Sequence, residues 1–348
     1  MSCLEREITE RRLTRFIVKR DTTMVRNLLR LVVHFSAAVG LGLVGMGAGA
    51  QGTDYPTRPI ELVVPYGAGG GTDVLARAFA ESARKHLGQP VMVVNKPGAS
   101  GAIGMADVVQ SRPDGYKLVM LVPEIAILPH MGIARFATED LVPIVRLNAD
   151  PLFLVVKGDS SLKSVDDFVE TARKAKEPMR FGNAGVGGVT HLAQLALEQR
   201  IGAKFIHAAF QGNAPAILSL LGGHIDAVTA TPSEVRSHMA NGQLKVLAVT
   251  SDQRLKGDEQ IPTLKESNVD LTVYTWRGVG APRGIPSGVM NKLVGAALKT
   301  AEEPAFKTAM EQLRLGYSVA NNETFRQEIV RDSAQYKQLI DRFGLKTQ

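Results

Sequence analysis

The chain has 348 residues, of which 45% are hydrophobic, 22% charged and 5% aromatic, and this ordinary globular composition excludes a disordered, collagen-like or coiled-coil protein. Residues 1–30 carry +4 of the net charge of +7 and residues 51–348 carry +3, because residues 31–50 contain no charged side chain. A body at +3 without a dense basic stripe argues against nucleic acid as a partner. The length suggests two domains.

The uncharged, mostly apolar stretch 31–50 follows two arginines and ends in a small-residue site at Ala50. This pattern is typical of a secretory signal peptide with cleavage after Ala50, and its glycines argue against the alternative, a transmembrane anchor. Residues 1–50 are therefore interpreted as the signal-peptide region, and we expect the mature protein to be secreted. Met24 begins a better-proportioned leader than Met1, so Met24 is the favoured translation start.

Cys3 is the only cysteine, and it lies upstream of the apolar stretch. The mature chain would therefore have no thiol, which excludes a catalytic cysteine, zinc–thiolate sites and iron–sulfur clusters. The histidines show no spacing typical of a metal site. A P-loop, a complete dinucleotide fingerprint and a GxSxG motif are all absent from the sequence, so we expect no metal, no cofactor and no catalytic residue.

Short apolar runs alternate with helical periodicity from Ile60 onward, which predicts a β-α-β-α-β unit with a parallel sheet covered on both faces. In this first unit the expected strands span 60–64, 91–94 and 118–122, and the expected helices span 72–87 and 101–110. A similar unit follows, in which Ser164 and Asp167 mark a capping box that opens a helix. Its expected strands span 152–156, 179–182, 205–209, 225–229 and 244–250, and its expected helices span 164–176, 189–200 and 214–221. The remainder is mostly helical, with helices expected at 287–300, 304–315 and 324–343.

Two glycine-rich loops stand at equivalent places, each between a strand and a helix of its unit. The first runs from Pro65 to Asp73, and the second runs from Phe181 to His191. A helix N-terminus offers free N–H groups and a positive dipole end, and glycine lets a ligand approach the backbone closely, so each loop could bind an anion. Two such loops facing one cleft would suit a small molecule with one or more carboxylates.

Several side chains near these loops have a structural interpretation beside a functional one. Thr72 and Asp73 could cap the first helix or contact a ligand, and Thr190 is similar. A helix-start hydrogen bond is the favoured interpretation of His191. Arg277 could grip a distal carboxylate bidentately, or it could form a surface ion pair.

These segments, in this order, resemble the tripartite tricarboxylate transporter substrate-binding family, the TctC-like receptors also called Bug (Bordetella uptake gene) receptors. The resemblance begins at Tyr55 and covers essentially all of residues 55–345. It is carried by the segments YPTRP at 55–59, VVPYGAGGGTD at 63–73, LGQPVMVVNKPGASGAIG at 87–104, PDGY at 113–116, FGNAGVGGVTHL at 181–192, QGNAP at 211–215, LLGGHIDA at 220–227, GQLKVLAVTS at 242–251, IPTLKE at 261–266 and TWRGVGAPRGIP at 275–286.

The resemblance implies an α/β type II periplasmic-binding fold, in which two lobes close on a ligand like a Venus flytrap. Lobe 1 would be discontinuous, with residues 51–149 and about 253–348, and lobe 2 would comprise about 150–252. It also implies a monomeric receptor that captures a small carboxylate, such as a di- or tricarboxylate, an amino acid or an aromatic acid. The partners would be the large and small membrane subunits of a tripartite transporter.

The resemblance also places the binding site in the two glycine-rich loops, largely through backbone groups and bridging waters, with the segments around Glu124 and Gln211 lining the cleft. Arg277 is added because its guanidinium could bind a carboxylate. The candidate ligand-binding residues are Tyr66, Gly67, Ala68, Gly69, Gly70, Thr72, Asp73, Glu124, Asn183, Ala184, Gly185, Val186, Thr190, His191, Gln211 and Arg277.

Glu124 departs from the family pattern, because the loop after the third strand is usually polar and small. A carboxylate there would repel an anion beside it. Either Glu124 turns outward, or it pairs with Arg277 or another base, or the ligand has a donor or cationic group at that point. Two other functions stay open at this stage: a sensory receptor that docks on a membrane sensor, and a small-molecule enzyme on a similar scaffold.

Overall fold

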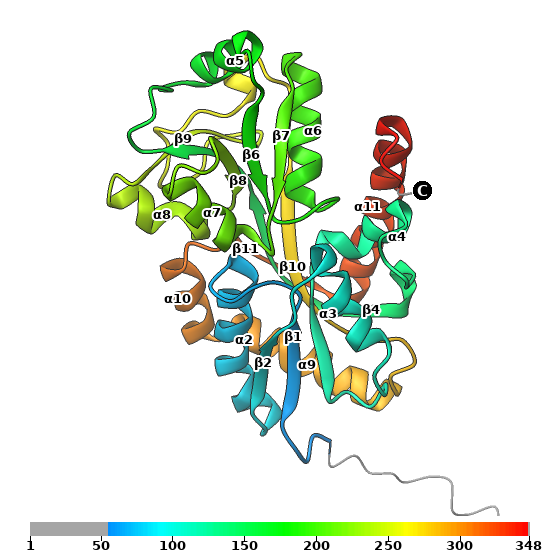
Figure 1. Cartoon of the computed structure of the whole chain (residues 1–348). Helices are drawn as coiled ribbons and strands as arrows, with labels where there is room; N and C mark the ends of the chain where they lie inside the picture. The colour runs from blue at the N-terminus through cyan, green and yellow to red at the C-terminus, as the bar shows by residue number, and fades with distance from the viewer. Residues whose placement is uncertain (1–54, 347–348) are drawn as a thin grey trace, which may run out of the picture. The chain divides into compact units, whose positions relative to one another are not determined.

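The computed structural model describes residues 55–346, so the predicted signal peptide lies outside the described residues. Among the residues described, no helix is long and apolar enough to cross a membrane. Two β-sheets organise this part of the chain, and helices cover both faces of each sheet (Figure 1).

The first sheet has six strands in the order β11-β4-β10-β3-β1-β2. Strand β1 pairs in parallel with β2 and β3, whereas β10 runs antiparallel to both β3 and β4. Its strands are β1 (Ile60–Val64), β2 (Val91–Asn95), β3 (Lys117–Leu121), β4 (Leu141–Pro151), β10 (Tyr274–Pro282) and β11 (Tyr317–Asn321). The expected parallel unit therefore forms one half of this sheet, and antiparallel strands from later in the chain form the other half.

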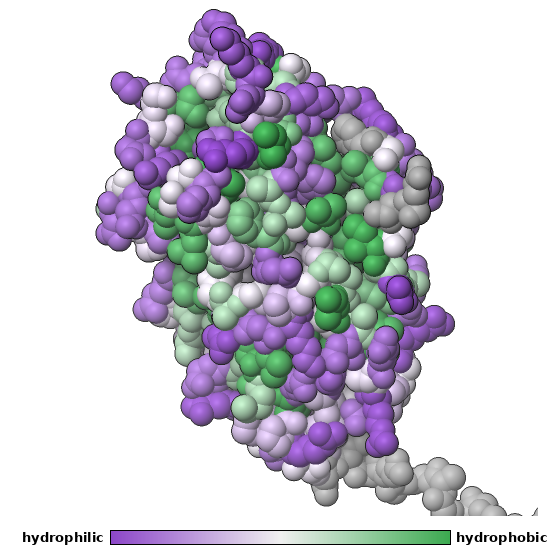
Figure 2. All heavy atoms as spheres, viewed as in Figure 1, coloured by the Kyte–Doolittle hydropathy of each residue, from purple (hydrophilic) through white to green (hydrophobic). Residues whose placement is uncertain are grey.

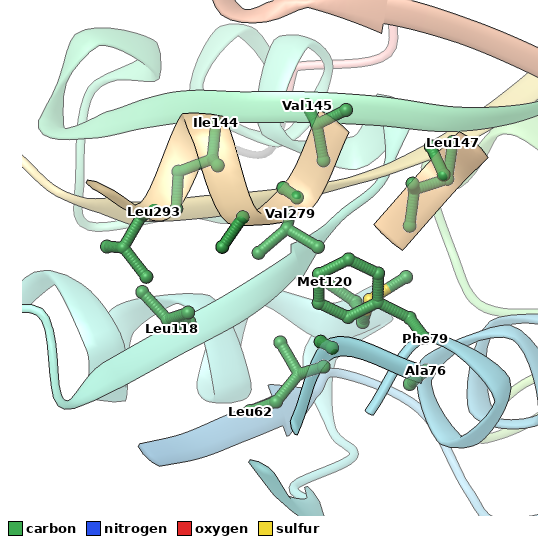
Figure 3. Close-up of a cluster of buried hydrophobic side chains, with 14 of the residues drawn as sticks. Leu62, Ala76, Phe79, Leu118, Met120, Ile144, Val145, Leu147, Val279 and Leu293 are labelled. Atoms are coloured by element: carbon green, nitrogen blue, oxygen red, sulfur yellow. The ribbon is translucent and has the colours of Figure 1, made fainter. Parts of the chain in front are cut away.

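Helices from both ends of the described chain pack on the first sheet. The helical segments on it are α2 (Gly71–Leu87), η1 (Ala99–Gly101), α3 (Ala102–Val109), η2 (Pro123–Ala126), α4 (Leu128–Met131), η3 (Thr138–Asp140), α9 (Ser287–Glu302), α10 (Pro304–Gln312) and α11 (Asn322–Phe343). On one face, Phe79 of α2 and Leu293 of α9 point into a cluster with Met120 and Val279 of the strands (Figure 3). On the other face, α3, η2, α4 and α11 cover a second apolar cluster.

The second sheet has five strands in the order β7-β6-β8-β5-β9. They are β5 (Phe153–Lys157), β6 (Met179–Asn183), β7 (Phe205–Ala209), β8 (Ala227–Ala230) and β9 (Leu244–Val249). The helical segments with this sheet are α5 (Val165–Lys174), α6 (Val189–Ile201), α7 (Asn213–Leu221), α8 (Pro232–Ala240) and η4 (Lys265–Ser267). Phe181 and Phe205 meet edge to face with ring centroids 4.9 Å apart, and Phe168 of α5 closes this aromatic centre.

Thr250 ties together the segments that pass between the two sheets. The chain leaves the first sheet after β4 and enters the second at β5, and Leu152 lies between them. The Leu152 N–H donates to Thr250 Oγ1 at 2.8 Å, and this hydroxyl donates to the Val273 carbonyl, just before β10, at 2.6 Å. The crossing segments are thus joined by hydrogen bonds to one buried side chain.

Candidate functional site

A cavity lies where the two sheets' loops meet, with about 490 Å³ of space between its atoms, including the part open to solvent. Residues from both sheets line it, so the cavity stands between the two halves of the fold. The lining residues are Tyr66, Gly67, Gly70, Gly71, Thr72, Val122, Glu124, Leu152, Ala184, Val189, Thr190, Gly212, Asn213, Ala214, Thr231, Glu234, Thr275 and Arg277.

The first glycine-rich loop brings the N-terminus of α2 to this cavity. Strand β1 ends at Val64 and α2 begins at Gly71, so the loop crosses the carboxyl edge of the parallel strands, where ligands of open α/β sheets bind. The Gly71 N–H donates to Glu234 Oε1 at 3.0 Å. A carboxylate of this chain therefore occupies one of the free donors at the helix start.

Asp73 shapes this loop and does not line the cavity. Its carboxylate accepts hydrogen bonds from the Gly69 N–H at 2.9 Å, from Arg77 at 3.0 Å and from Asn95 at 2.9 Å. Burial raises the pKa of Asp73, but these hydrogen bonds outweigh burial and leave the pKa below its ordinary value. Ala68 and Gly69 stand at the turn of the loop, outside the lining set, and Gly69 has a φ of +83° that favours glycine.

The second glycine-rich loop brings the N-terminus of α6 to the same cavity through Ala184, Val189 and Thr190. The Ala184 N–H donates to Thr190 Oγ1 at 3.0 Å, and the Gly185 N–H donates to Asn183 Oδ1 at 3.0 Å. Asn183 is fully buried, so it holds the loop without lining the cavity.

Three further predicted residues of this segment stand away from the lining set. Gly185 has a φ of +144° and packs against Ser100, whose hydroxyl donates to the Val186 carbonyl at 2.5 Å. The Val186 side chain is exposed. The Gly187 N–H donates to His191 Nδ1 at 3.1 Å, which is the helix-start hydrogen bond that the sequence favoured.

Glu124 is buried and faces the cavity, with 2% of its surface exposed. It projects from η2, next to the first sheet, and its Oε1 accepts a 2.9 Å hydrogen bond from the Val189 N–H of α6. The Tyr66 hydroxyl also hydrogen bonds to it. Burial raises the pKa of Glu124 above its ordinary value, and these two hydrogen bonds oppose that rise. Of the alternatives that the sequence left open, the outward orientation is excluded.

Arg277 enters the cavity from β10 and is 4% exposed, so it is a buried cation and not part of a surface ion pair. Its Nη1 donates to Asp150 at 2.9 Å and to Asn148 at 2.8 Å, and its Nε donates to Thr72 Oγ1 at 3.1 Å. Asp150 therefore balances the charge of Arg277, and Thr72 links this cation to the start of α2.

Asn213 and Glu234 line the cavity, and neither was named as a candidate, although Asn213 lies in the segment around Gln211 that was expected there. Asn213 begins α7, and its Nδ2 donates to Glu234 Oε2 at 2.8 Å. The signal for Glu234 is the Thr-x-x-Glu capping box that Thr231 begins, since the Thr231 N–H donates to Glu234 Oε2 at 2.8 Å. Gln211 contributes only its carbonyl near the cavity, which accepts from the Gly67 N–H at 3.2 Å.

The cavity thus brings together eight of the sixteen candidate residues, from both halves of the fold. Those that line it are Tyr66, Gly67, Gly70, Thr72, Glu124, Ala184, Thr190 and Arg277. Among residues 55–346, no group of three or more His, Cys, Asp or Glu side chains could hold a metal ion.

Two sheets that are joined by crossing strands, with a cavity between their loops, define the class of two-lobe periplasmic solute-binding proteins. Residues 75–345 match the family described as "Tripartite tricarboxylate transporter family receptor". The chain belongs to this family, which is one of solute-binding receptors.

Individual relatives agree with this assignment. The chain is 31% identical over 311 residues to a Cupriavidus necator protein described as "UPF0065 protein in gbd 5'region", which covers 89% of this chain and 95% of that protein. It is 48% identical to a crystal structure of a TctC solute binding protein from Polaromonas, with a TM-score of 0.62 over 83% of this chain and 99% of that chain. The periplasmic binding protein BugD is 31% identical, with a TM-score of 0.81 over 84% of this chain and 100% of that chain.

Proposed function

We propose that this protein is a periplasmic receptor that captures a small carboxylate and delivers it to the membrane subunits of a tripartite transporter. The observation that carries the proposal is the cavity between the N-termini of α2 and α6, where Thr72, Thr190 and Arg277 supply donors. Helix N-termini and a guanidinium are the groups that bind carboxylates in proteins. The eight lining candidates are its proposed ligand contacts, whereas Asp73, Asn183 and His191 hold the loops in shape.

The proposed movement is closure of one lobe, residues 51–149 and about 253–348, against the other, about 150–252. The division of strands between the two sheets supports these bounds. The 48% identical relative gives a TM-score of 0.62, below the 0.81 of the 31% identical one. Such a reversal is expected when lobes of the same fold are oriented differently, which supports a hinge. Ligand binding would shift this open–closed equilibrium, and the transporter would recognise the closed form.

The proposal includes export by the signal peptide at 1–50, action as a monomer, and release of the ligand unchanged instead of catalysis. The test is a thermal-shift screen of the protein purified from the periplasm, unfolded and refolded to remove carried-over ligand, against mono-, di- and tricarboxylates and amino acids. A ligand at 100 times its Kd stabilises the folded state by about 2.7 kcal/mol. A hit that is recovered chemically unchanged supports a receptor. Turnover of the hit, or a blank panel with folded protein, contradicts the proposal.

A further inference from the structure

Two polar groups in the cavity have no partner in the part of the chain that the structure describes. Asn213 is 8% exposed, and its Oδ1 accepts no hydrogen bond. Arg277 donates hydrogen bonds from Nε to Thr72 and from Nη1 to Asn148 and Asp150. Its Nη2 donates to no described residue. Two residues that line the cavity therefore keep one cationic donor and one neutral acceptor that the described chain leaves unused.

The charged side chains that line the cavity differ in whether they have an ion-pair partner. Arg277 is balanced by Asp150, which does not line the cavity. Glu124 and Glu234 do line it, and both receive hydrogen bonds from helix N-termini, but no Lys, Arg or His pairs with either carboxylate among the described residues. A buried carboxylate without an ion pair is costly, and burial accordingly raises the pKa of Glu124, against the opposing charge of Arg277. A cationic group on the ligand would remove this cost.

We infer that the ligand of this receptor is an amino acid, with an ammonium group that Glu124 and Asn213 Oδ1 accept and a carboxylate that Arg277 Nη2 binds. The inference rests on the proposed function and narrows its ligand class. An ammonium has three donors and no acceptor, and so complements a carboxylate and an amide oxygen. A di- or tricarboxylate without an amine would place further negative charge beside Glu124 and leave Asn213 Oδ1 unpaired.

Matched pairs of acids test this assignment in the wild-type protein. The pairs are aspartate and succinate, glutamate and glutarate, alanine and propionate, and phenylalanine and 3-phenylpropionate, which share a carbon skeleton and differ by the amine. Calorimetry at pH 7 should find one amino acid that binds at least about tenfold more tightly than its partner, as expected for a hydrogen bond to a charged group.

The substitution Glu124→Gln tests whether Glu124 binds the ammonium group of the ligand. Glutamine keeps the shape and an oxygen that accepts from the Val189 N–H, but it removes the charge. We expect the preference for the amino acid to fall at least about tenfold, with binding of the amine-free acid unchanged or tighter. Glu323→Gln removes an exposed carboxylate that lies outside the cavity and is the matched control, with the preference retained. Circular dichroism and a thermal melt establish that each variant is folded.

The outcomes separate this inference from the proposed function. If an amine-free acid binds as tightly as its amino acid in the wild-type protein, the inference is wrong and the carboxylate receptor stands. The inference also fails if Glu124→Gln is folded and keeps the full preference. If neither member of any pair binds the folded wild-type protein, both the inference and the proposed function are contradicted. The wild-type comparison decides the matter even where Glu124→Gln does not fold.

Discussion

At the scale of single residues, His191 shows how a neutral imidazole can hold a loop. Its Nδ1 accepts the Gly187 N–H, which requires an unprotonated Nδ1. The ring packs edge to face on His207, with centroids 4.8 Å apart, and Glu198 lies close to the same pair. Burial, and the neighbouring His207 after it, lower the pKa of His191 to about 4, whereas Glu198 raises it.

This pKa predicts a loss of stability on acidification. The unfolded chain binds a proton at His191 near pH 6.5, but the folded chain does so only near pH 4. The stabilising contribution is therefore complete above pH 6.5 and is lost as the pH falls to about 4, at a cost of about 3 kcal/mol. His191→Asn keeps an acceptor near the position of Nδ1 and should lower this dependence, as measured by urea unfolding at several pH values. The exposed His224→Asn should retain the wild-type slope, and an equal slope in both variants would contradict the assignment.

At the scale of elements, the sequence predicts a helix or strand best where neighbouring residues alone determine it. Ser164 accepts from the Asp167 N–H at 3.1 Å and starts α5, which confirms the predicted capping box. Strands β4, β10 and β11 and helix α8 were missed. Strand β4 contains Pro143, Pro151 and Arg146, and its strand conformation depends on pairing with β10, more than a hundred residues later in the chain. The inward orientation of the Glu124 side chain could not be predicted from the sequence either, because it depends on a hydrogen bond from the distant helix α6.

The start of α2 allows a prediction from two neighbouring glycines. A Cβ at Gly71 would lie 2.8 Å from Arg277 Nη2, whereas a Cβ at Gly70 would have no neighbour closer than 3.7 Å. Gly71→Ala should therefore displace a buried guanidinium and lower the free energy of unfolding by about 1–3 kcal/mol. Gly70→Ala has room and a φ of −79°, so its change should stay within about 0.5 kcal/mol. Chemical denaturation of both variants checks the difference, and equal stabilities would show that Arg277 adapts freely.

At the scale of the whole molecule, the fold combines two sheets whose connections decide how the halves work together. The resemblance in the sequence led to the two-lobe fold, whereas composition and periodicity alone gave two α/β units without the antiparallel pairing of β10. In the view of Figure 2, hydrophobic residues form scattered groups between hydrophilic ones. Four large apolar clusters lie inside one half each, and a fifth joins Ile127 and Met131 of the first half to Val189 and Leu192 of the second. The crossing segments, the cavity and this fifth cluster are therefore places where one half influences the other.

Thr250 is the side chain through which these crossing segments can be tested. It is 2% exposed, and its hydroxyl accepts from the Leu152 N–H and donates to the Val273 carbonyl. Thr250→Val keeps the shape but leaves both backbone groups unpaired, at about 1–3 kcal/mol each. We expect the free energy of unfolding to fall by about 2–4 kcal/mol in urea titrations. Thr272→Val, nearby in the crossing segment, loses only a solvent-exposed hydrogen bond to Asp252 and should change stability by less than about 1 kcal/mol. A Thr250→Val protein as stable as the Thr272→Val protein would mean that the junction between the halves does not depend on this hydroxyl.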